Sequence, residues 1–270
     1  MTAASLALAA CEIWRPSGLD GAVEVVVAGP ANRSFPTRMT QALGICLKLG
    51  ASHTLHCDGR RLEYPAHALC IRPPGCVWSC GSTGAVGFVS IDIDPSGLPS
   101  EAFSGRMTFL PGAELPEMQR AVAVLRRARS TLLRQEAVAA LVNALEERLR
   151  PDRARQDGPR TAVARAREVL AARLGSPPTL DELARITGAN KFVLLRHFKR
   201  ELGITPHALV VAMRIDEART LLGRGVPQAD TAVSLGFADQ AHFSRTFKRA
   251  VGMTPGQYVR QARAVSAPTR

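Results

Sequence analysis

A nine-residue segment that occurs twice constrains the fold of this chain more than any other feature of its sequence. The segment Phe198–Pro206 reads Phe-Lys-Arg-Glu-Leu-Gly-Ile-Thr-Pro, and 49 positions later Phe247–Pro255 reads Phe-Lys-Arg-Ala-Val-Gly-Met-Thr-Pro. At the same offset Leu183–Ile186 aligns with Ala232–Leu235. Such a repeat indicates that one supersecondary unit is present in two copies.

Residues that prefer helix ends divide each copy into a short helix, a turn and a longer basic helix. Thr, Asn and Asp accept hydrogen bonds from the first backbone N–H groups of a helix, and glycine adopts the left-handed conformation that ends one. The predicted boundary residues are Thr179 with Glu182, Gly188, Asn190, Gly203, Thr205-Pro206, Gln228 or Asp230, Gly236, Asp239, Gly252 and Thr254-Pro255. Two helices joined by a short turn form a helix-turn-helix, so the pattern predicts two such units joined by a helix over 206–222.

Positive charge is concentrated in the half of the chain that carries the repeat. From Pro159 to the end there are 18 Lys and Arg against 8 Asp and Glu, whereas residues 1–158 have 17 against 15. A basic domain joined to a nearly neutral one is typical of a protein that binds a polyanion with one domain and performs another task with the other. The alternative is a basic surface that serves only solubility.

The first 150 residues predict a β-rich domain followed by helices. Short apolar runs separated by turn residues indicate strands at Val23–Ala28, Leu43–Leu49, His53–Cys57, Ala68–Ile71 and Val86–Ile93. Helical spacing of apolar residues over 116–150 indicates two helices or one bent helix. Residues 151–159 predict a linker between a domain of 1–150 and a domain of 160–264. The apolar stretch Thr2–Cys11 is too short to cross a bilayer, and we interpret it as a frayed arm.

A longer set of residues in the C-terminal domain matches the pattern of a known domain. The matching residues are Leu180-Asp181-Glu182-Leu183-Ala184, Leu194-x3-Phe198-Lys199-Arg200-x2-Gly203-x-Thr205-Pro206, Arg214-Ile215-x2-Ala218-x2-Leu221-Leu222 and Gly236-Phe237-Ala238-Asp239-Gln240-x2-Phe243-Ser244-Arg245-x-Phe247-Lys248-x3-Gly252-Met253-Thr254-Pro255-Gly256-x-Tyr258. Residues 160–264 thus resemble the DNA-binding domain of the AraC/XylS family of bacterial transcription regulators.

The resemblance implies a complete α+β architecture and a set of partners. An N-terminal cupin-like barrel would bind a small-molecule effector, and a helical hairpin over about 116–150 would form a homodimer. The C-terminal domain would bind double-stranded promoter DNA and contact RNA polymerase in the cytoplasm, with activation favoured over repression. In the barrel, Gly59-Arg60-Arg61-Leu62 and Ile71-Arg72-Pro73-Pro74-Gly75 carry a weaker match. The paired histidines of metal-binding cupins are not evident around Arg38–Leu49, so we expect no metal and no cofactor.

The two longer helices should each bury one face and expose another. Leu194 and Phe198 in the first, and Phe243 and Phe247 in the second, are spaced four apart and should face the core. The residues predicted to contact DNA are Asn190, Lys191, Phe192, Leu195, Arg196, Lys199, Gln240, His242, Arg245, Lys248 and Arg249.

Different side chains in this set suit different parts of DNA. Arg196 and Arg245 can pair with guanine O6 and N7, and Gln240 with adenine N6 and N7. Lys199, Lys248 and Arg249, with Arg200, suit phosphates, which position a protein without specifying sequence. The family places base contacts at the positions of Gln240, His242 and Arg245. Phe192 and Leu195 suit thymine methyl groups or additional core, Arg196 suits a base or a phosphate, and His242 a base edge or a phosphate.

All six cysteines lie before residue 81, together with His53, His56 and His67. In a reducing cytosol structural disulfides are not expected. One hypothesis is a thiol- or metal-responsive regulator, with Cys76 and Cys80 as the reactive pair. The favoured interpretation is that Cys46, Cys57 and Cys70 are small buried hydrophobic residues of strands.

No motif predicts catalysis. Asp92 and Asp94 alternate on a strand without a metallohydrolase motif, a phosphate-binding glycine loop or a nucleophile elbow, and we expect them at the end of an exposed strand. Three classes remain: an effector-controlled regulator, an enzyme fused to a DNA-binding module, and an architectural DNA-binding protein without an effector. The first is favoured.

Overall fold

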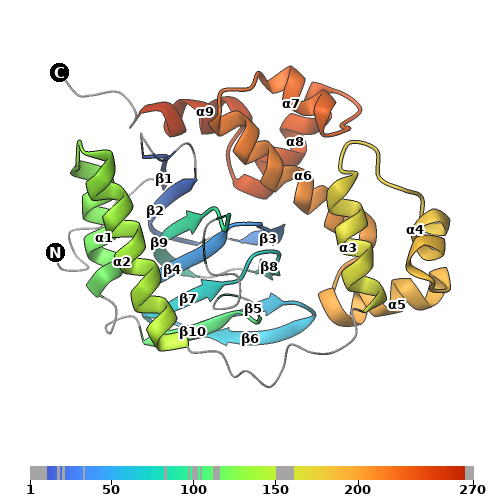
Figure 1. Cartoon of the computed structure of the whole chain (residues 1–270), viewed down its shortest axis with the longest axis horizontal. Coiled ribbons are helices and arrows are strands. Elements are labelled where there is room, and N and C mark those ends of the chain that lie inside the picture. Colours follow the sequence, from blue (N-terminus) through green and yellow to red (C-terminus); the bar gives the residue numbers. More distant parts are fainter. Residues whose placement is uncertain are drawn as a thin grey trace.

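The computed structural model describes residues 11–16, 19, 22–32, 34–81, 84–96, 98, 103, 105–111, 116–149 and 161–264. An N-terminal double sheet is followed by a helical hairpin and then by a helical C-terminal domain (Figure 1). The predicted α+β class, with a β-rich N-terminal part and helix-turn-helix units after it, is confirmed. The predicted linker 151–159 lies outside the described residues.

Ten strands form two antiparallel sheets within the described residues. They are β1 (Cys11–Trp14), β2 (Val23–Asn32), β3 (Phe35–Met39), β4 (Leu43–Leu49), β5 (His53–Cys57), β6 (Arg60–Tyr64), β7 (Ala68–Arg72), β8 (Val77–Cys80), β9 (Ala85–Ile93) and β10 (Thr108–Pro111). The six-stranded sheet has the order β1-β2-β9-β4-β7-β10, and the four-stranded sheet has the order β3-β8-β5-β6.

All five strands predicted from apolar runs are present, whereas β1, β3, β6, β8 and β10 were not identified. These five strands have only four or five residues each, which is too short for a clear alternating pattern. The interpretation of Thr2–Cys11 as a frayed arm is wrong at its last residue, because Cys11 begins β1 and pairs with Ala28 of β2. Backbone pairing with β2 is the physical reason that this short segment is ordered.

The helical hairpin covers one face of the six-stranded sheet (Figure 1). It consists of α1 (Pro116–Arg127) and α2 (Thr131–Leu149), so the predicted helical region is two helices. Met118 and Leu125 of α1 and Leu141 of α2 are almost fully buried in one core with residues such as Ile91 of β9. Burial of apolar area at about 25 cal/mol per Å² stabilises this layer.

Seven helices make up the described C-terminal domain. They are α3 (Ala162–Ala172), α4 (Leu180–Thr187), α5 (Lys191–Leu202), α6 (Pro206–Gly223), α7 (Gln228–Ser234), α8 (Gln240–Val251) and α9 (Pro255–Ala264). None of the helices in the described part of the chain combines the length and the apolar character that crossing a bilayer requires.

The predicted N-terminal boundaries of α4, α5 and α8 are confirmed. The hydroxyl of Thr179 and the side chain of Glu182 form the capping box of α4, and Asn190 and Asp239 cap α5 and α8. Helix α7 begins at Gln228, as one of the two predictions had it. Neither predicted side chain caps it, however, because Pro227 occupies the N-cap position and no side chain accepts a hydrogen bond there.

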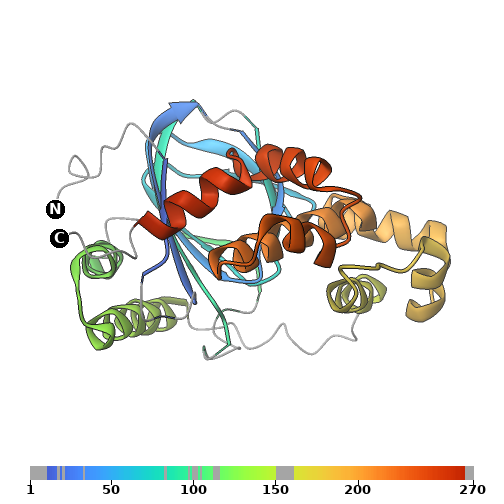
Figure 2. The ribbon, with the colours of Figure 1, turned by 90° about the horizontal axis from the view of Figure 1, so that it is seen from above.

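The C-terminal domain packs against the N-terminal double sheet (Figure 2). Ile13 of β1 lies in one buried cluster with Phe247 of α8 and Tyr258 of α9. Met39 of β3 and Val77 of β8 lie in another with residues of α3 to α6. The two halves therefore share apolar core.

Candidate nucleic-acid interface

Helices α5 and α8 are the second helices of the two helix-turn-helix units. Leu194 and Phe198 of α5, and Phe243 and Phe247 of α8, have no exposed surface, which confirms the predicted core positions. Each helix is held by this apolar face, so its opposite face is available to a partner.

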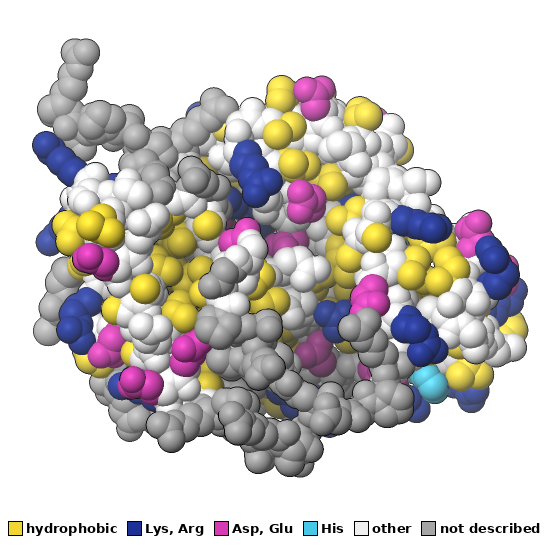
Figure 3. Space-filling model, viewed as in Figure 1, with side chains coloured by type: hydrophobic (Ala, Val, Ile, Leu, Met, Phe, Trp, Pro, Cys, Tyr) yellow, Lys and Arg dark blue, Asp and Glu magenta, His cyan; other side chains and the backbone are white. Residues whose placement is uncertain are grey.

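The residues predicted to contact DNA lie largely on the exposed faces. Nine of them are exposed, namely Asn190, Phe192, Arg196, Lys199, Gln240, His242, Arg245, Lys248 and Arg249, whereas Lys191 and Leu195 are partly buried. Phe192 has 67% of its surface exposed, so additional core is the wrong interpretation for this side chain. Lys and Arg side chains gather over α3, α4 and α5 on the face shown in Figure 3.

Some of these side chains already have partners and others do not. Asn190 accepts a hydrogen bond from the Phe192 backbone at 2.9 Å, and Lys191 pairs with Asp181 at 2.7 Å. The His242 ring lies edge-on to Phe237, with centroids 5.5 Å apart. Among the predicted DNA contacts, the charged and amide side chains that form no hydrogen bond or ion pair with a described residue are Arg196, Lys199, Gln240, Arg245, Lys248 and Arg249. Within the described part of the chain, their hydrogen-bonding groups are thus left for a ligand.

Arg214 of α6 joins the two helix-turn-helix units. Its guanidinium donates to the carbonyl of Leu174, before α4, and to the carbonyl of Gly236, in the turn before α8, both at 2.9 Å. A Cβ at Gly236 would lie 2.1 Å from the Gly175 carbonyl oxygen, so only glycine permits this approach. The two units are therefore packed against each other at a defined distance. Sequence reasoning gave Arg214 no role, although it lies in the family motif.

A cavity of about 320 Å³ lies between the two sheets, and residues of the C-terminal domain form part of its wall. Phe35, Trp78 and Phe88 line it from the sheets, Ile215 of α6 from above, and residues 249–253 from the end of α8. Arg249 is therefore at the rim of this cavity as well as on the exposed surface. The volume is at the lower end of the range for small-molecule sites.

Lys48 and Arg38 are two of the five cations that line this cavity, the others being Arg72, Arg219 and Arg249. Lys48 has no exposed surface, and its amine donates to the Tyr64 carbonyl and lies 4.3 Å from the Tyr64 ring centre. Burial lowers the pKa of Lys48 to about 8, and burial and the nearby Arg219 and Arg72 lower that of Arg38 to about 9. Arg72 and Arg219 pair with Asp92 of the cavity wall, whereas Lys48 and Arg38 form no ion pair with a described carboxylate.

A network of buried charges connects the double sheet to the C-terminal domain. Glu24 of β2 pairs with Arg15 at 3.0 Å and also with Arg219 of α6. Arg219 also contacts Asp92 of β9 at 3.3 Å, and the Tyr258 hydroxyl of α9 donates to Glu24. Burial alone would raise the pKa of Glu24, but the guanidinium groups of Arg219 and Arg15 hold that pKa below its ordinary value.

The expectation of an exposed strand end is wrong for Asp92. Asp92 is buried and pairs with Arg72 at 2.9 Å in addition to Arg219. The two guanidinium groups hold its pKa below the ordinary value in spite of burial. Asp94, two residues later, caps a turn by accepting from the Ser96 backbone at 2.9 Å. The physical reason for the difference is that α6 covers β9 at Asp92.

The cysteines are reduced, and most are buried in strands. Cys46, Cys57 and Cys70 are buried in β4, β5 and β7, as the favoured interpretation has it. The predicted pairing of Cys76 with Cys80 is wrong. The Cys80 thiol donates to the Thr54 carbonyl at 3.4 Å, whereas the Cys76 sulfur lies 3.1 Å from that of Cys57.

Comparisons with known proteins agree with this geometry. A family model described as "Helix-turn-helix domain" matches residues 183–261, from α4 into α9. The transcriptional activator RhaR of Klebsiella pneumoniae is 33% identical over 98 residues, which are 36% of this chain and 35% of RhaR. The regulator MtrA of Neisseria gonorrhoeae is 32% identical over 80 residues, which are 29% of this chain and 27% of MtrA. Residues 183–261 thus share a helix-turn-helix domain with these regulators, which agrees with the resemblance of residues 160–264 to the AraC/XylS family.

The chain thus spans about a quarter to a third of the length of these curated AraC/XylS relatives. Over nearly its whole length it shares a fold with ToxT of Vibrio cholerae, with a TM-score of 0.59 at 12% identity, covering 89% of this chain and 99% of ToxT. A structure of ToxT with a bound unsaturated fatty acid also matches, with a TM-score of 0.59 at 13% identity, covering 89% of this chain and 95% of ToxT.

Proposed function

We propose that this AraC/XylS protein is a sequence-specific transcription regulator that inserts α5 and α8 into successive major grooves of promoter DNA. The observation that carries the proposal is that both helices expose cationic side chains without a described partner, joined on α8 by the amide of Gln240, while Arg214 joins the two units at a defined distance. Helix α6, with 18 residues, rises about 27 Å between them. That length, extended by side chains, suits grooves about 34 Å apart.

The contacts divide into those that read bases and those that position the protein. Arg196 and Arg245 pair with guanine, and Gln240 pairs with adenine, because their side chains have two hydrogen-bonding atoms in the required geometry. Lys199 and Lys248, one turn farther along each helix, neutralise phosphates. Their lack of partners within the described part of the chain supports both assignments.

The effector of this regulator is a small anion with an apolar body, bound in the cavity between the two sheets. Aromatic and aliphatic walls suit an apolar body, and the buried amine of Lys48 suits a carboxylate, which would restore its charge partner. The fatty acid bound to ToxT, which has the same fold, is a ligand of this class. Because residues of α6 and α8 form part of the cavity wall, occupancy changes how the DNA-binding domain packs on the sheets.

The protein acts in the cytoplasm as a homodimer and contacts RNA polymerase. The hairpin of α1 and α2 supports the dimer, since Leu132 and Leu133 at the start of α2 are more than half exposed. Neighbouring large apolar side chains on a surface are typical of a contact with another protein chain. Activation rather than repression is supported by the name of RhaR, a transcriptional activator.

A pair of substitutions in α8 tests the function. Operator DNA is first selected by the purified protein from a randomised library. Arg245→Ala should weaken binding to the selected site by about 1 to 3 kcal/mol and relax selectivity at one base pair. Lys248→Ala, three residues along the same helix, should weaken selected and random DNA equally and reduce the salt dependence. Equal losses on both DNAs for Arg245→Ala would refute its role, and failure to select any sequence would refute the proposed function.

A further inference from the structure

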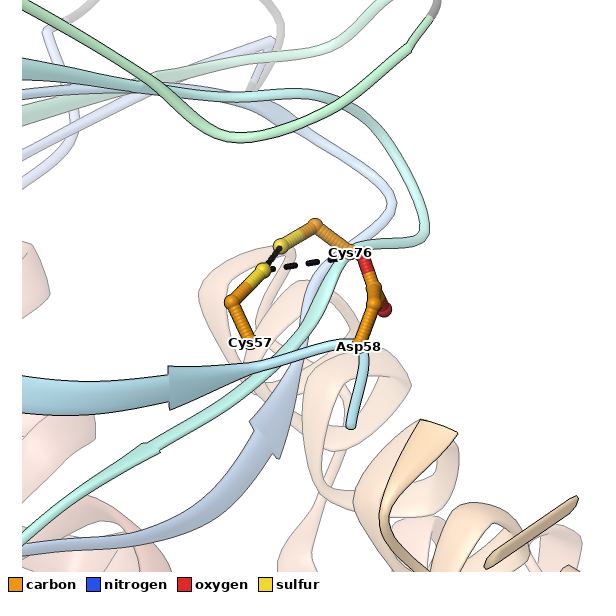
Figure 4. Close-up of side chains that lie close together, drawn as sticks. All are labelled: Cys57, Asp58 and Cys76. Atoms are coloured by element: carbon orange, nitrogen blue, oxygen red, sulfur yellow. Dashed lines mark hydrogen bonds between the residues drawn. The ribbon is translucent and has the colours of Figure 1, made fainter. Parts of the chain in front are cut away.

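Cys57 and Cys76 face each other at the junction between the double sheet and the first helix-turn-helix unit (Figure 4). Their sulfur atoms are 3.1 Å apart, and both side chains are buried. The contact follows from the sheet: Cys57, the last residue of β5, pairs with Trp78 of β8, and Cys76 immediately precedes β8. The residues are 19 positions apart, so the sequence shows no Cys-x-x-Cys motif.

The backbone around both sulfurs is held in place. The Asp58 backbone donates to the Val77 carbonyl at 2.9 Å, and the Val77 backbone donates to the Asp58 carboxylate at 3.1 Å. These two hydrogen bonds flank the sulfurs and keep the side chains face to face. A disulfide needs a sulfur separation of about 2.05 Å, so each sulfur has to move only about half an ångström.

Each cysteine adjoins a loop that contacts the C-terminal domain. After Cys57, the turn at Gly59 lies against the end of α5, since a Cβ at Gly59 would be 2.5 Å from the Arg200 carbonyl oxygen. Before Cys76, the Gly75 carbonyl accepts a hydrogen bond from Arg167 of α3 at 2.5 Å. A bond between the two sulfurs would therefore act on the contact with α5 of the first unit and on the contact with α3 beside it.

We propose that Cys57 and Cys76 form a reversible disulfide on reaction with a peroxide, and that this bond alters the packing of α5 on the double sheet. The hydrogen bond between the two sulfurs, burial and the Asp58 carboxylate raise the pKa of the Cys57 thiol, which also donates to that carboxylate at 3.5 Å. Cys57 thus keeps its proton, and we assign the attack to the Cys76 sulfur. The effect on transcription rests on the proposed function, whereas the site itself does not.

The reaction balances without a cofactor. The Cys76 thiolate attacks one peroxide oxygen, the O–O bond breaks, and hydroxide leaves and becomes water, so that Cys76 carries a sulfenic acid. The Cys57 sulfur then attacks the Cys76 sulfur, the S–O bond breaks, and the departing hydroxide takes the Cys57 proton as a second water. Two thiols are oxidised to one disulfide, and one hydrogen peroxide is reduced to two waters.

A metal ion is a less suitable occupant of the same place. Cys57, Asp58 and Cys76 have ligand atoms within 4.8 Å of one another. Two thiolates on tetrahedral zinc, each about 2.3 Å from the ion, are however about 3.7 Å apart, farther than these sulfurs. Both oxygens of the Asp58 carboxylate already accept a hydrogen bond, one from the Val77 backbone at 3.1 Å and the other from the Cys57 thiol at 3.5 Å.

Disulfide mapping of the full-length protein tests the site. Reduced protein is treated with hydrogen peroxide, free thiols are alkylated, and peptides are identified by mass spectrometry. We expect a Cys57–Cys76 cross-link that dithiothreitol reverses, no cross-link in Cys76→Ser, and an undiminished one in the matched control Cys80→Ser. In Cys57→Ser, Cys76 should accumulate a sulfenic acid that dimedone traps. Absence of the cross-link in peroxide-treated wild-type protein would overturn the proposal.

Hydrogen exchange tests the effect on packing without any DNA. We expect the amides of residues 199–203, at the end of α5, to change protection when wild-type protein is oxidised and to stay unchanged in peroxide-treated Cys76→Ser. A cross-linked protein with unchanged exchange at these residues would overturn the coupling to α5. Because neither measurement involves DNA, both outcomes are independent of whether the protein regulates transcription.

Discussion

Replacing Arg219 by methionine should weaken the connection between the double sheet and the C-terminal domain more than any single change at the surface. The substitution keeps the apolar part of the side chain but leaves Glu24 and Asp92 buried with one fewer cation each. Removing one partner of a buried ion pair lowers the free energy of unfolding by about 3 to 5 kcal/mol. Since Arg15 still pairs with Glu24 and Arg72 with Asp92, we expect the lower end, about 3 kcal/mol.

The assay exploits the position of the tryptophans. The chain has two, Trp14 and Trp78, and both lie in the double sheet, so unfolding of the sheets changes their fluorescence. Far-ultraviolet circular dichroism is dominated by helices, most of which belong to the C-terminal domain. In urea, the two signals should change together in the wild-type protein. In Arg219→Met they should separate, with the midpoint of at least one displaced to lower urea.

A matched control and the pH dependence sharpen the test. Arg224→Met, at the exposed end of the same helix, should change stability by less than about 0.5 kcal/mol. The pKa values of Glu24 and Asp92 are lowered in the wild-type protein, so the stabilisation from Arg219 is present at neutral pH and lost as pH falls through those values. The difference in free energy of unfolding between Arg219→Met and the wild-type protein should therefore become smaller below about pH 4. Identical midpoints for Arg219→Met and Arg224→Met at pH 7 would refute the reasoning.

Three further predictions concern the pH response, the cavity and the joint between the units. Burial raises the pKa of Asp216 to about 6, so the free energy of unfolding of the wild-type protein falls as pH rises from about 4 to 6. Over that interval, Asp216→Asn should become more stable than the wild-type protein by up to about 3 kcal/mol, as measured by urea titrations at each pH. Calorimetric binding of a long-chain monocarboxylate should weaken as pH rises through 8 and Lys48 loses its proton, while Lys48→Met should bind weakly at every pH. Uniform affinity in wild-type protein from pH 7 to 9 would contradict the role of Lys48. Arg214→Ala should reduce affinity for a two-groove site at least tenfold but leave a one-groove site unchanged in fluorescence anisotropy, and equal losses on both would contradict the joint.

Sequence reasoning succeeded where the determining interactions are local. The capping residues Thr179, Asn190 and Asp239 bond to backbone groups two or three residues away, so their effect can be read directly from spacing. The apolar pairs of α5 and α8 follow from helical periodicity in the same way. These interactions account for both helix-turn-helix units and for the exposed residues proposed to bind DNA.

Sequence reasoning failed where the interacting residues are far apart in the chain. Glu24 and Arg219 are 195 positions apart, and nothing in the neighbourhood of either shows that they meet. Cys76 was assigned to the nearby Cys80 because the register of β5 against β8, which brings Cys57 to it, is a property of the sheet. Lys48 stands in a strand among apolar residues, and its burial depends on the second sheet, which sequence periodicity does not place.

The contact of α6 and the end of α8 with the cavity has a thermodynamic consequence. A molecule bound there touches walls from both the sheets and the C-terminal domain, so its affinity depends on how the two are packed. Because such coupling is reciprocal, a partner that shifts the C-terminal domain on the sheets changes the affinity for that molecule by the same factor by which the molecule changes the affinity for the partner. We therefore expect promoter DNA to alter the concentration of signal to which the protein responds.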